Sequence, residues 1–143
     1  RGNVETRLRK LDEGQYEAIL LAGAGLKRLG LAHRVTAWLD APGWLSAPGQ
    51  GAIAIQSRTD DPVVGPLVAA LHDAPTGVAA FAERALLNAL EGGCQVPIGA
   101  AVVPDEHGAP VLHGLVAALD GARLVRGALA VDPAGPTAAG RAL

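Results

Sequence analysis

Cysteine and aromatic residues are scarce in this chain, and these two shortages limit the disulfides and the kind of core that it can form. The 143 residues include one cysteine, no methionine, one phenylalanine, one tyrosine and two tryptophans. One cysteine cannot form an internal disulfide, so nothing indicates a secreted, disulfide-stabilised domain. Because half of the residues are apolar but so few are aromatic, we expect a core of alanine, valine, leucine and isoleucine.

Strong charge and long apolar runs are lacking too. The formal net charge of −2 at pH 7 argues against non-specific electrostatic binding to nucleic acid. No apolar run approaches the roughly 20 residues needed to cross a bilayer, and the charged start carries no signal-type apolar region. We therefore expect a cytoplasmic protein without nucleic-acid or membrane partners. Because the chain lacks an initiator methionine and opens on a helix signal, we also expect it to be a fragment.

The first 39 residues predict short helices around a buried strand. Asn3 can cap a helix, and apolar residues at helical spacing predict that helix over 4–12. The run Y-E-A-I-L-L-A predicts a buried strand over 16–22. A glycine turn then leads into a helical segment that contains Arg28, and a further helical segment is expected over 32–39.

A change of composition follows at residues 40–51. Two prolines and three glycines in this stretch predict a loop. The run A-I-A-I-Q-S then predicts a strand over 52–57, and Asp60-Asp61-Pro62 predicts the start of a helix that ends near His72.

The remaining sequence predicts a helix packed on a small sheet. After a break at 74–77, apolar residues recur at the spacing of one helix face over 77–91. Three strand-like runs follow, separated by turn residues at 105–108 and 120–121; they span 98–103, 111–118 and 123–131. This order predicts a three-stranded antiparallel meander, and Thr137 is expected to cap a final helix.

The single cysteine, Cys94, lies in the run L-E-G-G-C-Q-V-P-I-G-A. A lone cysteine is often a small buried apolar residue. Gly92 and Gly93, however, allow a sharp bend out of the preceding helix, and Pro97 stiffens the exit. A thiol on such a bend suits a nucleophile or an attachment point. A helix C-terminus would raise the pKa of this thiol, so any activation must come from other groups.

The arginines near the N-terminus are candidates for an anion site. Arg1 lies just before the first predicted helix, Arg7 lies within it off the apolar stripe, and Arg28 follows the glycine turn. Guanidinium groups bind carboxylates through two parallel hydrogen bonds, and helix N–H groups add to that attraction. An arginine taken alone is more often a solvated surface residue than part of a site, so both interpretations stay open.

Other common sites are disfavoured. The G-A-G turn lacks the third glycine of a dinucleotide-binding fingerprint, because Arg28 occupies that position. The four histidines show no paired ligand spacing and the lone cysteine gives no C-x-x-C, so we predict no metal site. No G-x-S-x-G elbow is present.

Four motifs resemble the porphobilinogen deaminase (hydroxymethylbilane synthase) family. They are R-G-N-V-E-T-R-L-R-K-L at 1–11, A-I-L-L-A-G-A-G-L-K-R-L-G-L at 18–31, P-G-Q-G-A-I-A-I at 48–55 and A-E-R-A-L-L-N-A-L-E-G-G-C-Q-V-P-I-G-A at 82–100. The resemblance runs in order from residue 1 to about residue 131. The cysteine motif is its most specific part.

The resemblance implies an architecture of α/β plus α+β type. Residues 1–45 would be the second half of domain 2, and 46–73 would cross back to give domain 1 a strand and a helix. Both domains of the family are α/β units that resemble periplasmic binding proteins. Residues 74–143 would form domain 3, a small three-stranded antiparallel sheet with helices on one face. The family is expected to be monomeric at full length.

The resemblance also implies a chemistry. Cys94 would carry a dipyrromethane cofactor through a thioether, and four porphobilinogen molecules would be joined to that primer with loss of ammonia. Water would then release the linear tetrapyrrole. Arg1, Arg7 and Arg28 match family arginines that bind cofactor and substrate carboxylates, and Gln50 matches a residue that lines the cleft.

One departure limits this expectation. The essential aspartate of the family has no matching motif in this chain, so we expect these residues alone to be inactive. Ser46 also stands where the family often has proline. The rival interpretation is a non-catalytic α/β module that binds an anion through its arginines and carries an inert cysteine.

Overall fold

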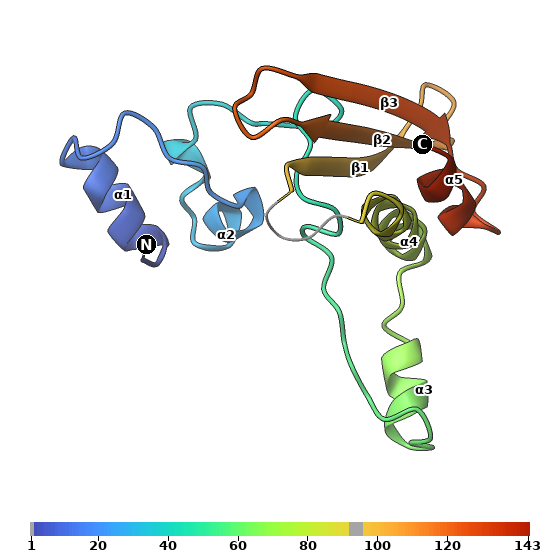
Figure 1. The fold of residues 1–143 in the computed structure, drawn as a ribbon. Coiled ribbons are helices and arrows are strands. Elements are labelled where there is room, and N and C mark those ends of the chain that lie inside the picture. Colours follow the sequence, from blue (N-terminus) through green and yellow to red (C-terminus); the bar gives the residue numbers. More distant parts are fainter. Residues whose placement is uncertain (1, 92–95) are drawn as a thin grey trace. The chain divides into compact units, whose positions relative to one another are not determined.

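The structure is a computed structural model that describes residues 2–91 and 96–143. The chain forms two compact units, Arg1–Leu39 and Asp40–Leu143, and each is described by itself (Figure 1). Two of the predicted site residues, Arg1 and Cys94, lie outside the described residues.

In the first unit, the helix predicted over 4–12 is confirmed as α1 (Val4–Asp12). The side chain of Asn3 accepts a hydrogen bond from the Thr6 N–H at 2.9 Å and so caps the helix as expected. The glycine turn leads into α2 (Gly23–Arg28). Leu8 of α1 and Leu26 of α2 are the buried apolar residues of this unit.

Two predictions for the first unit are wrong. Residues 16–22 form no strand, because a strand needs a neighbour for its backbone hydrogen bonds and no described segment pairs with them. Of the helix predicted over 32–39, only a 3-10 turn forms, η1 (Ala32–Arg34). The chain turns back after it, and a Cβ placed on Gly23 would lie 2.5 Å from the ring of Trp38. The contact between Trp38 and α2 therefore takes the place of a longer helix.

Residues 52–57 likewise form no strand, since they pair with no described segment. The helix predicted to start at Asp60 is shorter than expected and forms only α3 (Val64–Ala69). Its start is set by Asp61, whose carboxylate accepts hydrogen bonds from the N–H groups of Val63 and Val64. These bonds lower the pKa of Asp61 below its usual value.

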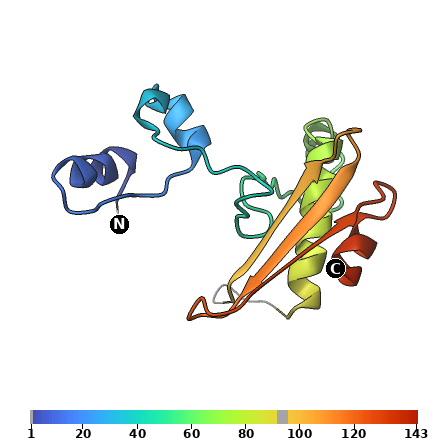
Figure 2. The ribbon, with the colours of Figure 1, turned by 90° about the horizontal axis from the view of Figure 1, so that it is seen from above.

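The predicted meander is confirmed. Its strands are β1 (Ile98–Pro104), β2 (Pro110–Ala117) and β3 (Leu124–Ala130), which pair antiparallel in the order β1-β2-β3. Gly108 and Gly121 adopt positive φ angles of 82° and 71° in the two predicted turns. Figures 1 and 2 show α4 (Ala74–Ala89) and α5 (Pro136–Ala142) on one face of this sheet.

The two helices of the sheet domain differ from expectation at their starts. Helix α4 begins at Ala74 rather than at residue 77, because the Asp73 carboxylate caps it and a proline in the first turn lacks only an N–H that would be unpaired there. Thr137 lies inside α5 and does not cap it; Gly135 holds the capping position.

The core of the sheet domain is built from small aliphatic residues, as the composition predicts. Its buried cluster is Ala82, Leu86, Ala100, Leu112, Val131 and Ala139. The two helices touch through a glycine, because a Cβ on Gly140 would lie 2.2 Å from the carbonyl oxygen of Ala82 and 2.6 Å from the nitrogen of Leu86. Close approach of α4 and α5 therefore requires glycine at this position.

Gly140→Ala is expected to separate α5 from α4 and to lower the free energy of unfolding by about 1–3 kcal/mol, the usual effect of overpacking. Gly65→Ala is the matched control, because Gly65 is also helical and a Cβ there would meet nothing within 4 Å. Chemical denaturation measures both variants. Equal stability of the two variants would contradict the close contact.

The cap of α4 predicts a pH dependence. Hydrogen bonds from the Thr76 side chain and N–H lower the pKa of Asp73 below its usual value of 3.8. The ionised carboxylate therefore stabilises the fold above that value, and the contribution is lost as the pH falls through the lowered pKa. Wild type should be more stable than Asp73→Asn near neutral pH and lose that advantage on acidification below about pH 4. Thermal unfolding between about pH 7 and about pH 2 tests this; a constant difference would refute it.

Candidate functional site

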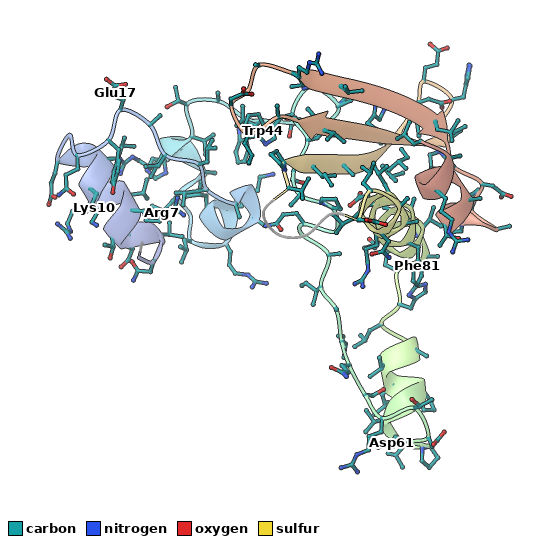
Figure 3. All side chains as sticks on the ribbon, in the orientation of Figure 1. Arg7, Lys10, Glu17, Trp44, Asp61 and Phe81 are labelled. Carbon is teal, nitrogen blue, oxygen red and sulfur yellow. The ribbon has the colours of Figure 1, made fainter. Side chains whose placement is uncertain are left out.

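Arg7 lies on α1, where its side chain is half-buried. Its Nη2 donates a hydrogen bond to the carbonyl oxygen of Leu20 at 2.9 Å, so the guanidinium is turned toward the segment that leads into α2 (Figure 3). The bond to the Leu20 carbonyl thus fixes the orientation of the guanidinium. Its other N–H groups bond to no described residue and can face a ligand.

Arg28 is the last residue of α2 and is exposed. The chain turns directly after it, where Gly30 has a φ of 71°. Arg28 therefore offers an exposed cation at the end of a short helix. Arg7 and Arg28 belong to the first unit, whereas the third described candidate, Gln50, belongs to the second.

Gln50 is exposed at the tip of a tight turn in the second unit. Gly49 and Gly51 on either side have φ angles of 74° and 90°, and the N–H of Gln50 bonds to the carbonyl oxygen of Ala47 at 3.1 Å. The turn borders a pocket of about 320 Å³ on the side of α4. The lining residues are Gly49, Gln50, Gly51, Ala52, Thr76, Ala79, Ala80 and Glu83.

Glu83 is a residue of this pocket that the sequence analysis missed. Its Oε2 accepts a hydrogen bond from the N–H of Gly49 at 2.7 Å, and its Oε1 accepts one from the N–H of Val102 at 3.0 Å. The half-buried carboxylate on α4 thus joins the Gln50 turn to β1. The only signal in the sequence is an acidic residue beside the apolar stripe of the helix.

Further contacts hold the segment before this turn to the sheet. We call residues 42–51 the crossing segment. Arg126 on β3 donates hydrogen bonds to the carbonyl oxygens of Pro42 and Gly43 at 3.1 and 3.2 Å. The N–H of Ala100 on β1 bonds to the carbonyl oxygen of Ser46 at 2.9 Å. The crossing segment is therefore attached to both edge strands.

The crossing segment also packs closely on β1. A Cβ on Gly99 would lie 2.9 Å from Cβ of Leu45 and 3.1 Å from its carbonyl oxygen. Gly99 belongs to the P-I-G-A end of the cysteine motif, five positions after Cys94, so packing against Leu45 requires a glycine at this end of the motif. Together with the bond from Gly49 to Glu83, this packing brings the cysteine motif into contact with the P-G-Q-G motif and with the residues just before it.

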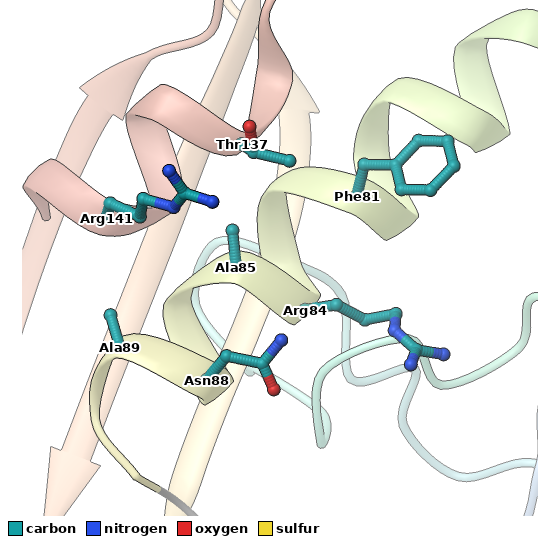
Figure 4. Close-up of a pocket in the computed structure, with 7 residues that line it drawn as sticks. All are labelled: Phe81, Arg84, Ala85, Asn88, Ala89, Thr137 and Arg141. Atoms are coloured by element: carbon teal, nitrogen blue, oxygen red, sulfur yellow. The ribbon is translucent and has the colours of Figure 1, made fainter.

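A second pocket, of about 370 Å³, lies between α4 and α5 (Figure 4). Its lining residues are Phe81, Arg84, Ala85, Asn88, Ala89, Thr137 and Arg141. Figure 4 shows the guanidinium of Arg141 over Ala85, whereas that of Arg84 is directed away from it. The two cations do not converge on one point, and none of the three described candidates, Arg7, Arg28 and Gln50, lines this pocket.

Residues 2–91 and 96–143 contain no group of three or more histidine, cysteine or acidic residues that could hold a metal ion. No helix in this part of the chain is long and apolar enough to cross a membrane.

Comparison with known proteins gives two family matches, one after the other along the chain. The family model described as "Porphobilinogen deaminase, dipyromethane cofactor binding domain" matches residues 1–65. The model described as "Porphobilinogen deaminase, C-terminal domain" matches residues 78–143. The two matches define the class as proteins in which a dipyrromethane cofactor-binding domain is followed by a C-terminal domain.

Curated relatives agree with these matches. The chain is 54% identical over 142 residues to porphobilinogen deaminase of Syntrophobacter fumaroxidans, which covers 99% of the chain and 45% of the relative. It is 48% identical over 143 residues to that of Gloeobacter violaceus, covering 100% of the chain and 44% of the relative. The chain belongs to the porphobilinogen deaminase family, which confirms the resemblance, and it spans less than half the length of these relatives.

Proposed function

We propose that the chain is the cofactor-bearing part of a hydroxymethylbilane synthase. The protein would join four porphobilinogen molecules head to tail, each with loss of ammonia, and then release the linear tetrapyrrole by hydrolysis. The observation that carries this proposal is the ordered match of one chain to both family models, the first of which is named for the dipyrromethane cofactor.

The side chains of the chain fit a dipyrromethane group. Each pyrrole unit carries one acetate and one propionate, and guanidinium groups suit planar carboxylates. Arg28 is exposed, and Arg7 has N–H donors beyond its bond to Leu20 that contact no described acceptor. Bound here, dipyrromethane would supply the primer to which the pyrroles are added.

The proposed roles follow from this fit. The thiol of Cys94 forms a thioether, which unlike an ester survives hydrolytic release of the product. Arg1, Arg7 and Arg28 bind carboxylates of cofactor and substrate, and their charge offsets the acidity that accumulates as the chain grows. Gln50 lines the cleft as an uncharged hydrogen-bonding group.

The proposed domain organisation assigns 1–45 to domain 2, 46–73 to domain 1 and 74–143 to domain 3. The first two would complete α/β domains like those of periplasmic binding proteins. The unpaired apolar run 52–57 supports this assignment, because Ile53 is 90% exposed and needs an apolar cover. We further propose a cytoplasmic, monomeric enzyme whose activity requires more residues than these.

Intact-mass measurement on the full-length protein tests the function directly. After expression in cells that make porphobilinogen, the wild type should carry a covalent increment of two pyrrole units. Cys94→Ser should lack it, because a serine hydroxyl does not form the thioether. A bare polypeptide mass for the wild type would favour the rival anion-binding module with an inert cysteine.

Arg7 and Arg9 of α1 form a matched pair for testing the carboxylate site. Arg9 is exposed and pairs with Glu13 on its own helix, so it serves as the control. In the full-length protein, Arg7→Gln should lower kcat/KM about tenfold to hundredfold, the worth of a charged hydrogen bond. Arg9→Gln should change kcat/KM by less than about twofold.

The two variants should have similar thermal unfolding midpoints, which separates binding from folding. Steady-state kinetics with porphobilinogen give the comparison. Equal kcat/KM values for the two variants would remove Arg7 from the site.

A further inference from the structure

Glu83 differs from the other carboxylates in its reach along the sequence. Its partners Gly49 and Val102 lie 34 and 19 positions away. Among the described residues, the other carboxylates that accept backbone N–H groups bond two to four positions away, within turns and helix caps. Those bonds shape local structure, whereas Glu83 joins elements that are remote in sequence.

Both oxygens of Glu83 are occupied by backbone amides, so the side chain acts through its partners. The carboxylate borders the same pocket as Gln50, and each of its oxygens is directed at a backbone N–H, so the turn and the strand set its orientation. Glu83 is therefore suited to hold a neighbouring residue in place rather than to take part in chemistry.

The turn that Glu83 holds needs an external restraint. Gly49 and Gly51 both adopt positive φ, and glycine reaches many other conformations when nothing fixes it. Only a 3.1 Å bond from Gln50 to Ala47 and a 3.3 Å bond from Ala52 to Gly49 close the turn internally. The 2.7 Å bond to Glu83 attaches it to α4.

We propose that Glu83 is a positioning residue of the pyrrole-assembling site, an inference that rests on the function proposed above. Helix α4 ends at Ala89 and β1 begins at Ile98, so the two elements that Glu83 joins are those that flank the connection containing Cys94. Through Glu83, the Gln50 turn takes a fixed position relative to both ends of that connection. Gln50, which we assign to domain 1, is thereby held in place by domain 3, the domain that contains Cys94.

The test uses the full-length protein and four variants, Glu83→Gln, Gln50→Ala, their double mutant and Glu106→Gln. In Glu83→Gln the amide NH₂ group replaces one acceptor and faces a backbone N–H, so one of the two bonds is lost. Glu106→Gln makes the same change on an exposed side chain. Steady-state kinetics, thermal unfolding and intact mass are measured for each.

We expect Glu83→Gln to lower kcat/KM by about tenfold or more, because a hydrogen bond to a charged group is lost. Glu106→Gln should behave as wild type, and the two-pyrrole mass increment should persist in all variants. In the Gln50→Ala background, Glu83→Gln should have little further effect on kcat/KM. A purely structural role predicts additive effects instead.

Additive losses, or a Glu83→Gln enzyme as active as Glu106→Gln, would overturn the positioning role. If Glu83→Gln fails to fold, Glu83→Asp replaces it, because the shorter carboxylate keeps the charge but cannot reach both amides; the same non-additivity is then required. Failure of the proposed function is distinguishable, because the wild type itself would lack both the mass increment and turnover of porphobilinogen.

Discussion

The edge of the small sheet formed by β1 has its free N–H groups bonded by residues outside the sheet. Strand β1 pairs with β2 on one side only, and an edge strand leaves N–H groups that need acceptors. Ser46 accepts from Ala100, and the carboxylate of Glu83 accepts from Val102 while also holding Gly49. The crossing segment therefore completes the sheet domain, and Glu83 is the group that binds helix, strand and crossing segment together.

Glycine and alanine make this attachment possible in a protein with almost no aromatic residues. Gly99 lets the crossing segment approach β1, and Gly140 lets α5 touch α4. Gly114 and Gly127 are paired across β2 and β3, and a Cβ on either would meet the side chain of Leu143 within about 3 Å. The elements pack closely because side chains are small, so larger residues at these positions would force elements apart.

The sequence predicted the sheet domain well because its signals are local. Alternating apolar residues and turn glycines within a short span define the meander over 98–131, and the apolar stripe defines the helix that precedes it. The strands expected over 16–22 and 52–57 did not form, because an apolar run shows only that burial is needed. Pairing depends on a partner strand, which no local pattern supplies.

The site was predicted unevenly for the same physical reason. Arg7, Arg28 and Gln50 came from matching motifs to a family, since spacing alone left each arginine as either a ligand group or a solvated residue. Glu83 was missed because its role is a contact between a side chain and a backbone amide 34 positions away. Charge and helix position are visible in the sequence, but the identity of such a partner is not.

Amide hydrogen exchange at Gly49 and Val102, resolved by residue, tests most directly whether Glu83 unites the crossing segment with the sheet domain. Both amides should be protected in the wild type and exchange about tenfold or more faster in Glu83→Gln, while the Ala100 amide, held by Ser46, should change less. Exchange at Gly49 and Val102 as fast as in open loops, and unaltered by the substitution, would contradict the account.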